Sequence, residues 1–184
     1  MSPTNLEIAS LKGLCENIVW THKVHEKQAD IELSRSKRCR YLANLLLAVS
    51  ASGILGTTVV DEWWLKTLLA ILSFGSLAIS IHRDASCFEL NFAEHSSYAR
   101  SFLRLRERAV NLLLQIGSHP KKEYWQAEFE SIQKDYLNLC DHAPRTSKKA
   151  LKKAGRAICE DEESSLLDLL NVLVKDTEPG GGIG

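Results

Sequence analysis

Four polar side chains recur along one apolar stretch at positions that share a helical face. Lys66, Ser73 and Ser80 are seven residues apart, and Ser76 follows Ser73 by three. Residues at these spacings lie on one side of an α-helix. Hydroxyls and a terminal ammonium in an apolar helix are typical of two arrangements: lining a water path inside an oligomer, or packing against a neighbouring helix. For these four residues the sequence leaves both open.

Small residues recur in the apolar stretch that precedes them. Ser52 and Gly56 have small-x-x-x-small spacing, and Gly53 and Thr57 repeat it one position later. Small side chains at this spacing let two helix backbones approach closely. We therefore expect these four residues to serve helix packing.

Both apolar stretches are long enough to cross a bilayer. Tyr41–Val60 is 20 residues without a formal charge, and Trp63–Ile81 carries only Lys66. A helix of 20 residues spans roughly 30 Å, the thickness of the hydrocarbon core. Two such stretches, separated only by Asp61-Glu62, predict a transmembrane hairpin over residues 41–81 (41–60 and 63–81) and argue against a soluble helical hairpin.

The flanking charges predict the orientation of this hairpin. Basic residues tend to stay on the cytoplasmic side. Arg83 and Arg100 follow the second stretch, whereas the connecting turn offers only Lys66. Six more basic residues precede the first stretch: Lys23, Lys27, Arg35, Lys37, Arg38 and Arg40. We expect a multi-pass protein of the cell membrane with both termini in the cytoplasm.

The remaining chain predicts helices. Thr4-x-x-Glu7 resembles a capping box, so one helix should run from about Asn5 into the first apolar stretch. No Pro or Gly follows the second stretch until Gly117, so that helix should continue without a break. Apolar residues at spacings of three and four extend from Phe88 to Ile116 and from Trp125 to Leu139.

These patterns predict an all-α membrane protein in which long cytosolic helices form a helical bundle. The expected parts are a cytosolic N-terminal helix (1–40), the hairpin, a cytosolic helical region (82–174) and a flexible Gly-rich tail (175–184). The first forty residues lack the apolar core of a cleavable signal peptide, so no such leader is expected.

The composition excludes several functional classes. The 184 residues carry 23 basic and 23 acidic side chains, so no net charge favours nucleic acid. The five cysteines are an odd number without a C-x-x-C pair, which favours reduced thiols. His22, His25 and Glu26 lie close enough to ligate a metal, but no second cluster supplies a fourth ligand. Without a recognisable nucleotide-binding or hydrolase motif, we expect no enzyme, metal or cofactor.

Two blocks of opposite charge lie near the C-terminus. Residues 145–156 hold six basic residues and no acid, and residues 160–163 are all acidic. The blocks can pair with each other on a solvated helix. Alternatively, the basic block binds anionic lipid headgroups, a nucleotide or a partner.

Several short motifs together resemble a known family. They are Trp20, His22-Lys23, His25-Glu26-Lys27, Ala29-Asp30, the arginine-rich approach to the two stretches, Tyr98-Ala99, Leu105-Arg106-Glu107, Trp125, Phe129, Asp135-Tyr136 and Ala143-Pro144-Arg145. Over roughly Leu6 to Ile158 the chain resembles the SLATT family of two-span effector domains, which associate with bacterial nucleotide-second-messenger enzymes and sensors.

The resemblance implies an antiviral or conflict role in bacteria. A partner synthase would make a nucleotide signal, and this protein would form a pore or disrupt the inner membrane, killing the cell or making it dormant. The implied partners are the bilayer, further copies of the chain, and nucleotide-synthase or sensor proteins. The alternatives are a membrane-anchored scaffold without pore activity and an enzyme with an unrecognised site.

Overall fold

The described part of the protein is helical throughout. The computed structural model describes residues 5–57, 62–116 and 122–160, of which 94% are helical and none is in a strand. The helices are α1 (Asn5–Thr57), α2 (Trp63–Ala85), α3 (Phe88–Ile116), α4 (Lys122–His142) and α5 (Lys148–Glu160). This confirms the all-α class, the start of the first helix at Asn5 and the break near Pro144.

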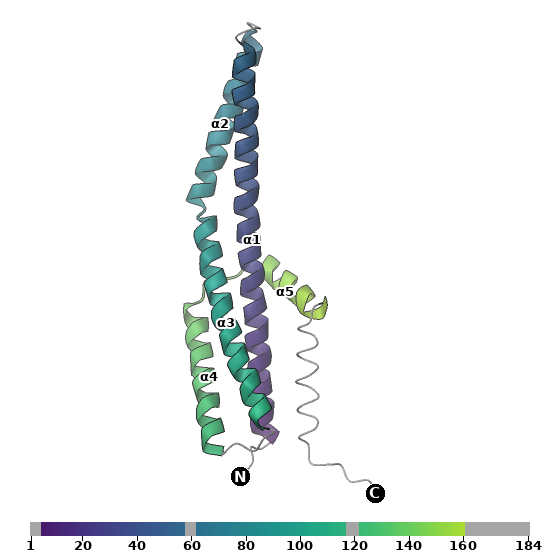
Figure 1. The fold of residues 1–184 in the computed structure, drawn as a ribbon, viewed down its shortest axis with the longest axis vertical. Helices are drawn as coiled ribbons and strands as arrows, with labels where there is room; N and C mark the ends of the chain where they lie inside the picture. The colour runs from purple at the N-terminus through teal and green to yellow at the C-terminus, as the bar shows by residue number, and fades with distance from the viewer. Residues whose placement is uncertain (1–4, 58–61, 117–121, 161–184) are drawn as a thin grey trace. The chain divides into compact units, whose positions relative to one another are not determined.

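The chain divides into two compact units. The first unit comprises Met1–Gln28 and Glu94–Gly184, and the second comprises Ala29–Ala93. Helices α1 and α3 contribute to both. Within the first unit, α3 and α4 run alongside the N-terminal part of α1 (Figure 1).

The core of the first unit forms from the apolar stripes of three helices. Helix α1 supplies Leu11 and Ile18, α3 supplies Leu105 and Ala109, and α4 supplies Trp125. The Trp125 ring stacks on Phe129 with centroids 5.6 Å apart. Because each stripe repeats every three or four residues, each helix turns one continuous apolar face inward. These are the faces that the spacing predicts.

Polar bonds join the same helices. The Arg108 guanidinium of α3 donates to Glu128 Oε1 at 2.9 Å and to Asp135 Oδ2 at 2.6 Å, both on α4. It also donates to Ser131 Oγ at 3.1 Å. The Tyr98 hydroxyl donates to the His142 carbonyl at 2.8 Å. One arginine thus joins three side chains on α4, which fixes the register of the two helices.

Helix α5 separates its charges from its apolar residues. Ala150 and Ala154 are fully buried. A Cβ added at Gly155 would lie 3.6 Å from the Trp20 ring of α1, so this face approaches α1 closely. Five basic side chains are exposed on the opposite face: Lys148, Lys149, Lys152, Lys153 and Arg156. Within the described ranges none of these five forms an ion pair.

A cap fixes the beginning of α5. Ser147 Oγ accepts a hydrogen bond from the Ala150 amide at 3.2 Å. Gln28 Oε1 of α1 accepts from the Ser147 amide at 3.0 Å and from its hydroxyl at 2.7 Å. Since a serine N-cap satisfies an otherwise free amide, this contact both starts α5 and attaches it to α1.

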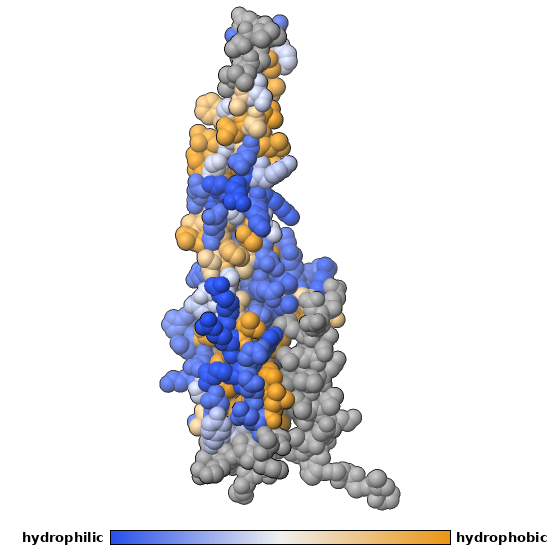
Figure 2. Space-filling model, viewed as in Figure 1, coloured by the Kyte–Doolittle hydropathy of each residue, from blue (hydrophilic) through white to orange (hydrophobic). Residues whose placement is uncertain are grey.

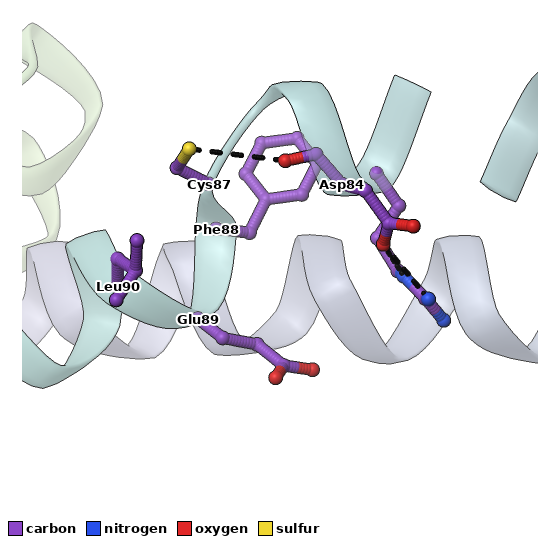
Figure 3. Close-up of a pocket in the computed structure, with 6 residues that line it drawn as sticks. Asp84, Cys87, Phe88, Glu89 and Leu90 are labelled. Carbon is purple, nitrogen blue, oxygen red and sulfur yellow. Dashed lines mark hydrogen bonds and ion pairs between the residues drawn. The ribbon is translucent and has the colours of Figure 1, made fainter. Parts of the chain in front are cut away.

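The second unit contains a helix break that the sequence does not predict. Instead of continuing, α2 ends at Ala85 and α3 begins at Phe88. Cys87 between them has a φ of 49°, in the left-handed region. Its amide donates to the Asp84 carbonyl at 3.3 Å, and its thiol lies 3.8 Å from the same oxygen (Figure 3). The expectation of an uninterrupted helix is therefore wrong at this joint.

Several predicted features fall outside the described residues. They are the turn at Asp61, the end of the first apolar stretch at 58–60, the break at 117–120, the acidic residues 161–163 and the tail at 175–184.

Candidate membrane-spanning site

The second unit places its large apolar side chains outward. Those of α2 include Trp63, Ile71 and Phe74, which are 76%, 62% and 72% exposed. Leu45 and Leu47 of α1 are also exposed. Figure 2 shows apolar residues gathered over α2 and the end of α1 on the face in view. Such a surface is unfavourable in water and matches a hydrocarbon environment.

Hydroxyl groups lie on the inner side of the same helices. Ser76 of α2 is buried, and its Oγ donates to the Ala43 carbonyl of α1 at 2.9 Å. Ser50 of α1 is also buried and donates to the Leu46 carbonyl of its own helix at 2.8 Å. Ser50 is not among the packing residues that the small-residue spacing predicts, although a serine within an apolar run is a usable signal.

The predicted polar residues of α2 lie on the side of the helix that contacts α1. Ser73 and Ser80 are half-buried on either side of buried Ser76, and Lys66 is exposed near the start of the helix. The structure therefore keeps the four residues on one side of α2. Within a single chain the centre of that stripe contacts α1.

The predicted packing residues of α1 differ in whether they contact α2. A Cβ added at Gly53 would overlap the Leu69 side chain of α2, so the backbone approaches closely there. Leu69 is only 6% exposed, although most large apolar side chains of α2 face outward. Ser52 is exposed, and its hydroxyl bonds the Ala48 carbonyl of its own helix. Gly56 and Thr57 belong to the last turn of α1, and their surroundings lie outside the described residues.

One helical stretch of the described chain is long and apolar enough to cross a membrane. It lies within Trp63–Gln115, and only 11% of its most apolar 18 residues are buried. The core helix of a soluble protein would be mostly buried. Of the first apolar stretch, the residues up to Thr57 are described.

A histidine cluster lies in the first unit. His25 Nδ1 of α1 lies 3.0 Å from His95 Nδ1 of α3, and His22 Nδ1 lies 2.9 Å from the Ala99 carbonyl. The His25 ring also stacks on Phe102, with centroids 5.5 Å apart. The proximity of His22 and His25 follows from the sequence. Their approach to His95 depends on how α1 and α3 pack.

Burial keeps His25 uncharged. Desolvation, together with the nearby His95 and His22, lowers its pKa from 6.5 to about 4. For Glu26, burial opposes ionisation, but the ammonium groups of Lys23 and Lys27 bring its pKa below the ordinary value. Among the described residues there is no group of three or more potential ligands able to hold a metal ion. The contacts of His25 with His95 and of His22 with the Ala99 carbonyl join α1 to α3.

A comparison with protein families shows which family the chain belongs to. The model of SMODS and SLOG-associating 2TM effector domain family 4 matches residues 8–168. The chain belongs to this family. The match covers both apolar stretches and runs from the first turn of α1 through α5. Neither the curated proteins nor the solved structures give a match.

Membership of the family connects the exposed apolar surface to a role. The family name describes effector domains with two transmembrane segments that associate with SMODS and SLOG domains. Family membership implies a two-transmembrane effector of conflict or antiviral systems. The apolar surface of α2 and the end of α1 is the part of the described chain that suits a bilayer.

Proposed function

We propose that this protein is a membrane effector of a bacterial antiviral system that assembles into a homo-oligomeric pore when a nucleotide second-messenger pathway activates it. The expected outcome of activation is loss of the inner-membrane barrier, followed by cell death or dormancy. The protein acts without catalysis and without a cofactor.

One observation carries this proposal: in the second unit large apolar side chains of α2 lie outside, whereas the hydroxyls of Ser50 and Ser76 lie inside. Phe74 and Ile71 face outward, whereas Ser76 is buried. Lipid tails stabilise the outer surface, and the hydroxyls stay away from them. Two helices cannot enclose a water path, so a pore requires several copies, four or more by the order of magnitude of channel geometry.

The Ser76 hydrogen bond suggests a closed state. In one chain its hydroxyl is occupied by the Ala43 carbonyl. Opening would release this bond and turn Ser73, Ser76 and Ser80 towards water in the lumen. Lys66 would then lie at one mouth of the path, near the exposed Trp63 and Trp64. Activation therefore requires that hydration of these hydroxyls in the lumen replace the hydrogen bond between Ser76 and Ala43.

The transmembrane hairpin and the cytosolic bundle are part of the same proposal. The short connection at 61–62 and the basic flanks support a topology with both termini in the cytoplasm. There the helices of the first unit are available to synthase or sensor proteins that carry SMODS or SLOG domains. Direct binding of nucleic acid is not expected.

Ion flux from liposomes tests pore formation. Purified protein is reconstituted with a trapped potassium-sensitive dye, and flux is recorded with and without its activating pathway partner. The structure guides the choice of variants. Ser76→Leu would collide with α1, so it cannot separate lining from packing. Ser73→Val and Ser80→Val replace half-buried hydroxyls without adding a long side chain.

Each variant has an expected result. Ser73→Val and Ser80→Val together should lower flux and toxicity by dewetting the path, with oligomer mass unchanged. Phe74→Leu, a change on the outward surface, is the matched control and should retain both. If the serine variant keeps full flux, the serine stripe does not line the path. If no condition gives flux while the protein is inserted, pore formation is refuted.

The alternative function is a membrane-anchored scaffold. The buried Ser76–Ala43 contact favours it, because a permanent helix pair needs such a bond even without a pore. In that case deleting the apolar stretches and supplying another anchor would preserve activity in cells. A pore-forming protein would lose activity in the same experiment.

A further inference from the structure

A basic pocket lies in the second unit, where α1, α2 and α3 meet. It has a volume of about 470 Å³ and is lined by Arg35, Arg38, Cys39, His82, Ser86 and Phe88. The first three belong to α1, and His82 and Ser86 lie at the end of α2. The His82 ring meets the edge of Phe88, with centroids 6.2 Å apart. The pocket therefore combines cationic side chains with an aromatic wall.

The acidic groups near this pocket already have partners. Glu32 Oε1 accepts from Arg35 Nη1 at 3.1 Å, and Asp84 Oδ1 accepts from Arg83 Nε at 2.9 Å. Glu89 accepts from the Ser36 hydroxyl at 3.0 Å. Arg38 is exposed and forms no ion pair within the described part of the chain. Of the two arginines that line the pocket, Arg38 is therefore the one whose guanidinium no described carboxylate engages.

The pocket adjoins the ends of both apolar stretches. Cys39 precedes Tyr41 by two residues, and His82 directly follows Ile81. If the stretches cross a bilayer, these positions lie where the hydrocarbon ends and lipid phosphates begin. A phosphate at this depth would meet Arg38 and Arg35 on α1, and its glycerol and upper acyl carbons would meet Phe88.

We propose that this basic pocket binds the headgroup of an anionic phospholipid on the cytoplasmic side of the membrane. The inference rests on the membrane insertion of the proposed function, but not on pore activity. The Arg38 guanidinium supplies parallel N–H donors for a phosphate, and Arg35 retains donors beyond the one that Glu32 uses. Basic pockets between transmembrane helices at the cytoplasmic face suit anionic headgroups.

Lipid retention in native mass spectrometry tests this site. The full chain is purified in a mild detergent and titrated with phosphatidylglycerol or phosphatidylcholine of the same acyl composition. We expect roughly tenfold tighter retention of phosphatidylglycerol, the scale of one or two charge contacts at a membrane surface. Arg35→Gln/Arg38→Gln should abolish this preference.

A matched variant separates the pocket from general attraction. Lys37→Gln/Arg40→Gln removes the same charge from the same segment of α1, but neither residue lines the pocket. This variant should keep the preference for phosphatidylglycerol. Equal loss in the two double variants would overturn the site, because general attraction would then explain the binding. Absence of a preference in the unaltered protein would also overturn it.

Cys39 provides a second readout that leaves the arginines in place. Cys15 is fully buried, so replacing Cys87, Cys140 and Cys159 by Ser leaves Cys39 as the accessible thiol. Phosphatidylglycerol in nanodiscs should slow its alkylation by a maleimide several-fold relative to phosphatidylcholine. Glycerol phosphate added to phosphatidylcholine nanodiscs should not. Protection by glycerol phosphate alone would assign the pocket to a soluble phosphate. If the protein prefers phosphatidylglycerol but gives no ion flux, pore formation is refuted and the lipid site is still supported.

Discussion

His25 and His95 share one hydrogen bond between buried rings, although 70 residues separate them in the chain. Their Nδ1 atoms lie 3.0 Å apart, so one ring donates and the other accepts. The contact cannot form when both Nδ1 atoms carry a proton. Protonation therefore weakens the junction of α1 and α3.

Acid should destabilise the first unit in a defined pH range. The pKa of His25 is about 4 in the folded chain against an ordinary value of 6.5. Because the unfolded chain takes up the proton first, stability is complete above pH 6.5 and falls as the pH decreases towards 4. Between pH 6.5 and 5 we expect a loss of about 2 kcal/mol. Denaturant unfolding followed by tryptophan fluorescence measures it.

Two variants isolate the contribution of His25. His25→Gln should flatten the pH dependence between 6.5 and 5, because it removes the titrating ring. His142→Gln, which changes an exposed histidine, should keep the original slope. An unchanged slope in His25→Gln would assign the acid sensitivity to other groups.

Gly53 should tolerate substitution less well than Gly75 on the facing helix. A Cβ at Gly53 would overlap Leu69, whereas one at Gly75 would meet only Leu46 at 3.8 Å. Gly53→Ala should therefore lower the thermal stability of the detergent-solubilised protein, whereas Gly75→Ala should leave it unchanged or raise it. Gly53→Ala/Leu69→Ala should recover part of the loss. Equal effects of the two single changes would contradict a close approach at Gly53.

Arg108 should stabilise the contact of α3 with α4. Its hydrogen bonds to Asp135 and Glu128 raise its pKa above the ordinary value. Arg108→Gln should cost about 1 kcal/mol of unfolding free energy, since the site is partly exposed and its charges are screened. The loss should shrink in 1 M salt. Arg104→Gln, on the same helix and without a described ion pair, is the control and should change little.

Cysteine reactivity should report both burial and topology. Cys15 is fully buried, and desolvation raises its pKa to about 11, so it should resist maleimide until the protein unfolds. Cys159 is exposed and should be labelled in inside-out vesicles but not in intact cells. A cysteine replacing exposed Glu62 should show the reverse accessibility. Labelling of Cys159 on intact cells by an impermeant reagent would refute the cytoplasmic C-terminal side.

Local periodicity explains why the helices and their apolar faces can be predicted. Trp125, Phe129 and Ile132 repeat at helical spacing, and they lie in or against the core of the first unit. The pattern needs no knowledge of the partner helix. The apolar stretch of α2 is similarly evident from composition alone.

Features that depend on three-dimensional contacts could not be predicted in this way. Cys87 adopts a left-handed conformation without a glycine or proline to indicate it. The approach of His95 to His25 depends on the register of two helices. The burial of Leu69 against Gly53 depends on which side of α2 meets α1, and an apolar residue in an apolar helix carries no signal of direction.

Although the net charge of the chain is zero, α5 carries a local excess of positive charge. This helix holds five basic residues and one acidic residue in 13 positions, and its cations occupy one exposed face. Chromatographic retention depends on such a face rather than on the summed charge. At pH 7 the solubilised protein should therefore bind a cation exchanger near its isoelectric point. Lys149→Gln/Lys152→Gln/Lys153→Gln should elute at lower salt than Arg100→Gln/Arg104→Gln/Lys134→Gln.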